Sequence, residues 1–199
     1  LISPMIIEDI ELSAFNYFPA ISLQVSNLII TDPLANNDTL LFAKNAFLNF
    51  DAYDLINKKY IVRKLVLKNG SLTAKVSTDG KENFNVFVSN NKPENKNFKF
   101  SLDQLNLKDF SFNYQNIPLS QEYDFTISDS KLKGQFSNQE YDLSILSSMS
   151  VNKFDLEGVN YISSKNANTE IILHVKNEPF SLVIKKGKLN FYKTLLIKC

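Results

Sequence analysis

The sequence predicts a mainly β protein that is built by repetition, and three observations lead to this fold class. Apolar and polar residues alternate along most of the chain, as they do in strands with one buried face. β-branched and aromatic residues dominate the alternating segments. One strand-bend-strand phrase recurs along the chain, which is typical of a structure that grows by adding neighbours, because one such unit cannot bury its apolar face alone.

The clearest copy of this phrase is VRKLVLKNGSLTAKV, residues 62–76, in which we expect two strands joined by a turn at Asn69-Gly70. The phrase returns in residues 102–115 as LDQLNLKDFSFNYQ, with Asp109 in the place of Asn69. Looser copies are LQVSNLIITD, which ends at Asp32, and TISDSKLKGQF, which contains Gly134. The apolar positions of the two clear copies are Leu65, Leu67 and Leu72 in the first and Leu105, Leu107, Phe112 and Tyr114 in the second.

The first half of the chain reads as strands interrupted by a loop and one helical segment. Alternation predicts strands over residues 1–17, 21–25 and 40–50, and the Asp-Pro pair at 32–33 opens a polar loop. The segment DAYDLINKKY, residues 51–60, suits one or two short helical turns. The polar stretch SNNKPENKN, residues 89–97, has almost nothing to bury and is the best linker, with a possible subdivision into 1–90 and 98–199.

The second half continues the alternating pattern to the end of the chain. We expect a strand pair over residues 98–114 and further strands over 123–127, 141–145, 151–156 and 169–175. A final hairpin is expected to turn at Lys186-Gly187. This prediction makes the whole chain one repetitive β region.

Composition excludes several classes of protein. The net charge is +1, from 22 basic and 21 acidic residues, so the chain lacks the basic excess that nucleic-acid binding requires. The one cysteine, Cys199, has no partner for a disulfide or a metal site. No apolar run is long enough to span a membrane, and the chain begins at Leu1 without a signal peptide, so we expect a fragment of a larger chain.

No residue constellation indicates catalysis, a metal or a cofactor. The only histidine, His174, lies in the apolar segment IILHV, and because one titratable residue does not make a site we expect a structural role for it. The carboxylate pairs Asp51 with Asp54 and Asp124 with Asp129 have generic spacing. The alternating aromatic residues around Phe112 could stack on bases or sugars, but without basic excess or Trp we expect burial or lipid contact.

The order of these features resembles the AsmA-like family of bacterial envelope proteins. The resemblance rests on the phrase FPAISLQVSNLIITD, the turn DLIN at residues 54–57, the strand pair at Leu65 to Leu72, and Gly80 followed by Asn83-Phe84. The later phrases LNLKDFSFNYQN and LEGVNYIS are similar to a second array of strands in the same family. Asn116 departs from the family phrase, in which an Asp is common near this place.

The resemblance implies an extended, twisted antiparallel sheet curled into an open groove. It implies that the protein is not an enzyme and has a role in outer-membrane biogenesis. In that role it would conduct phospholipid along an apolar β-groove in the periplasm, between the inner and outer membranes or their proteins. The parent chain would be anchored in the inner membrane by an N-terminal helix absent here. The candidate groove residues are Leu65, Leu67, Leu72, Leu105, Leu107, Phe112 and Tyr114.

Two alternatives remain open at the level of the sequence. One is a structural or adhesive β-sandwich without a lipid ligand, in which two sheets close on each other. The other is an enzyme acting on envelope polysaccharide, which would need carboxylates converging in a cleft. An open groove would differ from a sandwich by leaving an apolar surface of several hundred Å² uncovered, on the order expected for an interaction site.

Overall fold

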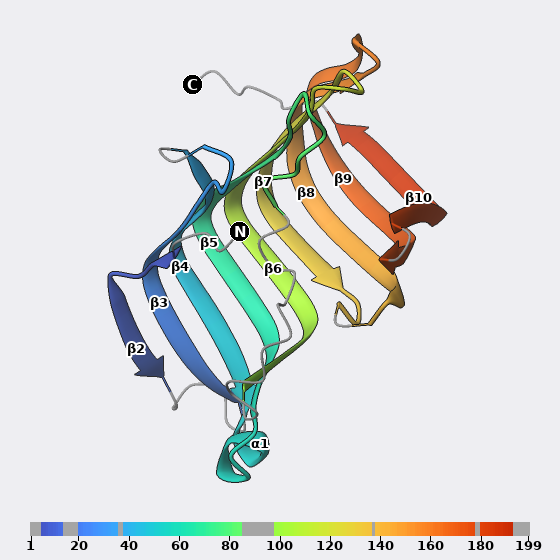
Figure 1. The fold of residues 1–199 in the computed structure, drawn as a ribbon. Coiled ribbons are helices and arrows are strands. Elements are labelled where there is room, and N and C mark those ends of the chain that lie inside the picture. The colour runs from blue at the N-terminus through green and yellow to red at the C-terminus, as the bar shows by residue number, and fades with distance from the viewer. Residues whose placement is uncertain are drawn as a thin grey trace, which may run out of the picture.

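The computed structural model describes residues 5–13, 20–35, 38–84, 98–136, 138–177 and 180–192, and these form one ten-stranded sheet with a single short helix (Figure 1). The strands of the first half are β1 (Met5–Ile6), β2 (Asp9–Ser13), β3 (Ala20–Thr31), β4 (Thr39–Asp51) and β5 (Tyr60–Val76). Those of the second half are β6 (Phe98–Asn116), β7 (Gln121–Lys133), β8 (Glu140–Leu156), β9 (Val159–Asn177) and β10 (Phe180–Tyr192). The predicted linker, residues 89–97, lies outside the described residues.

The sheet is open, with β2 at one edge and β10 at the other (Figure 1). From β3 to β10 the strands follow one another in chain order, while β1 and β2 both pair with β3. The prediction of a mainly β protein with a twisted, unclosed sheet and a short helical segment is confirmed. Within the described residues all strands belong to this one sheet, so the two facing sheets of a sandwich are not formed there.

One strand pair departs from the expected antiparallel order, because β5 and β6 run parallel. Leu65 pairs in register with Leu105, and Leu72 with Phe112. A parallel pair requires the chain to return to the starting end of the first strand, whereas a tight turn gives an antiparallel pair. The sheet is therefore continuous across the two halves of the chain, although the predicted subdivision at 1–90 and 98–199 remains a prediction.

The expected turn at Asn69-Gly70 is wrong, because β5 runs straight through it as one strand. Asn69 has a left-handed backbone, with φ of 53°, and Asp109 does the same in β6 with φ of 49°. A left-handed residue within a strand shifts the alternation by one, so that Leu67 and Gly70 face the same side of the sheet. The strand pair expected over 98–114 is likewise the single strand β6.

Two further expectations at the chain's ends are corrected or refined. The expected hairpin turn at Lys186-Gly187 is wrong. β10 continues through these residues, and the residues before and after them pair with β9. The expected long first strand is divided into β1 and β2 within its described residues. The helical segment is confirmed as α1 (Ala52–Ile56), whose first turn is capped by Asp51, since its carboxylate accepts hydrogen bonds from the backbone N–H groups of Tyr53 and Asp54.

The two faces of the sheet differ in chemistry. On one, which we call the apolar face, a buried cluster is surrounded by partly buried aliphatic and aromatic side chains. The members of the buried cluster are Val25, Ala43, Ala46, Leu67, Phe110 and Ile127. The opposite, polar face carries the intervening residues of the same strands, such as Lys68, Lys108 and Asp129. Among the described residues no helix is long and apolar enough to cross a membrane.

Candidate functional site

All seven predicted groove residues lie on the apolar face, on the two central strands. The parallel register places Leu65 beside Leu105 and Leu67 beside Leu107. Beyond the left-handed positions, Leu72 lies beside Phe112, and Tyr114 lies beside Ala74. The structure therefore brings together residues that are about forty positions apart in the sequence, as the repetition of the phrase predicts.

The burial of these residues is intermediate between a closed core and a free surface. Leu67 is 4% exposed and belongs to the buried cluster, whereas Leu65, Leu105, Leu107 and Phe112 are only partly buried and pack against it. The helix α1 contacts β4 and β5, and no second sheet is formed by the described residues. A sheet with one apolar face is stable when another apolar layer covers that face. Here the described chain supplies one layer.

Aromatic rings gather at the end of the apolar face where β6 leads into β7. The rings of Tyr114 and Tyr123 stack with centroids 5.3 Å apart, and Tyr123 stacks on Phe154 at 4.8 Å. Phe112 and Phe125 continue the row, with centroids 6.0 Å apart. Burial and the neighbouring Tyr114 raise the pKa of Tyr123, so its phenol stays protonated at neutral pH. This end of the face combines apolar rings with hydroxyl groups.

The buried side-chain amide of Asn83 fixes the loop that follows β5 at the aromatic end of the apolar face. Asn83 is fully buried; its side-chain oxygen accepts from the Lys75 backbone N–H at 2.7 Å, and its amide donates to Asp32 Oδ2 at 2.8 Å. The same amide donates to the Thr73 carbonyl at 3.0 Å. These bonds place the ring of Phe84 6.5 Å from that of Tyr114. The Asn83-Phe84 phrase of the sequence thus has a structural cause, since the Asn holds the loop and the Phe extends the aromatic row.

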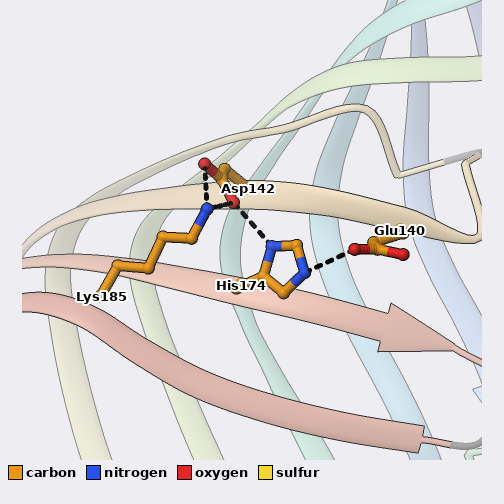
Figure 2. A network of polar contacts seen from close by, with 4 residues as sticks. All are labelled: Glu140, Asp142, His174 and Lys185. Carbon is orange, nitrogen blue, oxygen red and sulfur yellow. Dashed lines mark hydrogen bonds and ion pairs between the residues drawn. The ribbon is translucent and has the colours of Figure 1, made fainter.

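The polar face carries a network of charged groups around the only histidine (Figure 2). His174 Nδ1 lies 2.9 Å from Asp142 Oδ1, and Nε2 lies 2.8 Å from Glu140 Oε1. Lys185 Nζ donates to both oxygens of Asp142, at 2.7 and 2.9 Å. The network joins β8, β9 and β10 at one end of the sheet. The hydrogen bonds to Asp142 and Glu140 raise the pKa of His174, while those from Lys185 and His174 lower the pKa of Asp142.

The apolar segment IILHV lies in β9 (Val159–Asn177), and Val175 in it is buried, whereas His174 is partly exposed. Its neighbours Leu173 and Val175 face the apolar side, and the imidazole points to the polar side, with 29% of the side chain exposed. Its two ring nitrogens face the carboxylates of Asp142 and Glu140. Together with Lys185, these contacts tie three strands to one another.

A hollow of about 380 Å³ lies on the polar side of β7 to β10, away from the predicted groove residues. Its lining includes Lys131, Ser148, Asn168 and Lys188. Within the part of the chain that the structure describes, no group of three His, Cys, Asp or Glu residues is placed to hold a metal ion. The carboxylates Asp124 and Asp129 both lie on β7 and pair with neighbouring strands in the sheet.

Sequence reasoning found the central strands of the face but missed its aromatic end. Tyr123, Phe125 and Phe154 alternate correctly for strands, yet they lie outside the clear copies of the repeated phrase. Only the strand order places Tyr123 beside Tyr114. The same order places Phe125 beside Phe112, and Phe154 beside Tyr123. Comparison with family models, with curated proteins and with solved structures finds no match to this chain.

Proposed function

We propose that this chain is a non-enzymatic lipid-handling module that binds the acyl chains of phospholipid along its apolar face. The observation that carries the proposal is the partial burial of Leu65, Leu105, Leu107 and Phe112 on a sheet to which the described residues add no covering layer. Acyl chains are a suitable second layer, because burial of each CH₂ group is favourable by about 0.8 kcal/mol. Binding of this kind requires shape and apolar area, and it requires no catalytic residue.

The aromatic end suits the junction between acyl chain and head group. Tyrosine combines an apolar ring with a polar hydroxyl group. It is therefore favoured at positions where one side is apolar and the other is hydrated. Tyr114 also accepts a hydrogen bond at its hydroxyl from the Asn116 amide, at 3.2 Å, so polar groups are already collected there. We therefore place the ester and phosphate groups of a bound lipid near Tyr114 and Tyr123, with its acyl chains over the central leucines.

In the cell, we propose that the parent chain is an AsmA-like protein of the bacterial envelope, with this segment in the periplasm. The resemblance of the sequence phrases supports this assignment. An anchor in the inner membrane and a partner membrane or protein at the outer membrane would let the apolar face conduct phospholipid between them. A surface without a single dominant binding position permits such movement, since a lipid can slide from one part of the face to the next.

The test is native mass spectrometry of the segment expressed in a bacterial periplasm, with identification of any lipid released on denaturation. The decisive variant is Leu65→Asp with Leu105→Asp, because these registered neighbours are only partly buried. Ser71→Asp with Ser111→Asp is the matched control, since it adds the same two charges to the same strands on the polar face. We expect lipid in the wild type and the control, and at least a tenfold loss in the leucine variant.

A folded wild-type protein that carries no lipid would contradict the proposal and favour the structural alternative. The same holds if the leucine variant, folded by circular dichroism, retains as much lipid as the serine control. Leu67→Asp is less useful for this purpose, because Leu67 belongs to the buried cluster and a charge there tests folding as well as binding.

A further inference from the structure

In the part of the chain that the structure describes, the two edges of the sheet have no further strand beside them (Figure 1). Among the described residues, β2 pairs only with β3, and β10 pairs only with β9. β10 is long for an edge strand and exposes large apolar side chains, including Ile184 at 68% and Phe191 at 49%. Natural proteins shorten or cover such edges, because an unpaired row of backbone N–H and C=O groups is a template for another chain.

The two edges carry opposite charges. On the β10 edge Lys185, Lys186 and Lys188 are exposed. Lys185 is held by Asp142, whereas Lys186 Nζ makes only a long contact of 3.8 Å with Glu170. At the other edge Glu8, Asp9 and Glu11 are exposed, and Glu8 accepts a hydrogen bond from Asn27. Two β10 edges would bring lysines together, but a β10 edge and a β2 edge are complementary.

We infer that β10 of one molecule pairs with β2 of a second copy, so that molecules associate head to tail. The strand directions allow this, because seven antiparallel pairings and one parallel pairing separate β2 from β10, which leaves the two strands running in opposite directions. A second copy in the same orientation therefore presents β2 antiparallel to β10. Its apolar face also stays on the same side of the joined sheet.

One register satisfies both the charges and the faces. Asp9 opposite Lys188 and Glu11 opposite Lys186 form two pairs of opposite charge, and Ile10 then lies opposite Gly187. Ile10 is on the apolar face, since it pairs with Val25, and Gly187 is on the same face, since it pairs with Ile171. A Cβ at Gly187 would meet only Ile184 Cγ2, at 3.6 Å, so the Ile10 side chain of the second copy has space there.

This interface is heterologous, so each added copy leaves a free β2 edge and a free β10 edge, and the assembly grows as an open array. The joined sheets form one longer apolar face. That consequence for lipid movement rests on the proposed function, whereas the association itself does not require a lipid.

The association is tested by sedimentation velocity of the lipid-free 199-residue chain over a range of protein and salt concentrations. We expect reversible assemblies larger than dimers at low salt, and at least a tenfold weaker association in high salt, because the charge pairs are exposed. Lys186→Glu with Lys188→Glu gives one variant, and Asp9→Lys with Glu11→Lys gives another. Each alone is expected to be monomeric, since both of its edges then carry the same sign of charge.

Mixing the two charge variants is the sharpest step. In the mixture, the acidic β10 of the first variant can pair with the basic β2 of the second, and the basic β10 of the second can pair with the acidic β2 of the first. We therefore expect assemblies to form again. Disulfide trapping reports the register: in a Cys199→Ser background, Ile10→Cys with Gly187→Cys is expected to give a ladder of linked chains. Ile10→Cys with Val183→Cys is the control, because Val183 faces the polar side.

Three results would overturn the inference. The first is a wild-type chain that stays monomeric at all concentrations in low salt. The second is an assembly that the β10 variant abolishes and the β2 variant leaves intact, which would indicate a different partner for the basic edge. The third is equal disulfide linkage in the Gly187 and Val183 variants. None of these results bears on lipid binding by the monomer, so the two proposals fail independently.

Discussion

His174 shows how a single side chain couples the outer strands of the sheet to pH. Its two ring nitrogens face Asp142 on one side and Glu140 on the other, and a doubly protonated ring donates to both. The nearby Lys185 opposes this effect, because its positive charge lowers the pKa of His174. The hydrogen bonds to the carboxylates are the larger influence, so the pKa of His174 lies above its ordinary value.

The stability of the outer strands should therefore depend on the protonation of His174. The folded state binds this proton more tightly than the unfolded chain, so the stabilisation is fully present below the ordinary pKa of about 6.5 and is lost as pH rises through the folded-state pKa. We expect the melting temperatures of wild type and His174→Gln to differ more at acid pH than at alkaline pH. The chain has one histidine, so its NMR titration gives the pKa directly.

Lys185→Gln is the matched variant for this titration, because it removes the charge that opposes protonation and should raise the pKa of His174 further. A wild-type pKa at or below the ordinary value would contradict the assignment. Equal sensitivity of wild type and His174→Gln to pH would contradict it as well.

At the scale of the strands, the repeated phrase has a physical origin. Asn27 in β3, Asn69 in β5 and Asp109 in β6 all adopt left-handed backbone conformations, with φ near 50°. The registers of β3, β4, β5 and β6 place these three residues at the same level across the sheet. Adjacent strands keep their hydrogen bonds only if the alternation is interrupted at the same level in each. The phrase is repeated in the sequence because each strand must meet this requirement.

The sequence predicted an interruption at Asn69 and at Asp109, but as a turn between two strands. In the looser copy it placed the equivalent position at Asp32, whereas the left-handed residue is Asn27. Asn and Asp tolerate a left-handed backbone, and the same conformation serves a turn between two strands or an interruption within one. The choice depends on which strands lie alongside. For β5 the neighbours are β4 and β6, and the pairing with β6 joins residues far apart in the chain. Lys186-Gly187 was misread for the same reason, since β9 continues alongside it.

Gly70, which follows Asn69, is predicted to be the least replaceable glycine of the strands. A Cβ there would lie 2.1 Å from the Phe42 carbonyl oxygen and 2.7 Å from Phe110 Cε2. Because the first of these atoms is backbone, Gly70→Ala must displace β4 or the Phe110 ring, and we expect it to lower the free energy of unfolding by about 2 kcal/mol or more. Urea denaturation measures this change.

Gly187→Ala is the control for Gly70→Ala, because both glycines lie within strands and the added methyl group at 187 meets its nearest atom at 3.6 Å. We expect its unfolding free energy to stay within about 0.5 kcal/mol of the wild type. Comparable losses for the two variants would show that the cost arises from glycine replacement in strands generally, and would contradict the close packing of Phe110 over Gly70.

For the whole molecule, alternation along each strand was enough to predict a sheet with one apolar side, and repetition was enough to pair the two central phrases. Neither alternation nor repetition predicts the direction of the strands or which strands lie at the edges of the sheet. The parallel pair β5–β6 depends on how the chain returns between Val76 and Phe98, which local pattern does not encode. The aromatic row also depends on order, because Tyr123 meets Tyr114 and Phe154 only through its two neighbouring strands.

A face made of one sheet predicts how lipid affinity should vary. Contacts with the leucines of β5 and β6 grow with acyl length, since each fully buried CH₂ contributes about 0.8 kcal/mol, whereas the face offers few groups that distinguish one head group from another. With single-chain phospholipids below their micelle concentration, two added methylenes should therefore strengthen binding by roughly threefold to fifteenfold, the upper value corresponding to full burial. Exchange of the head group at constant chain length should change affinity less. Isothermal titration across both series checks this, and an affinity that follows the head group and ignores acyl length would contradict an open, unselective apolar face.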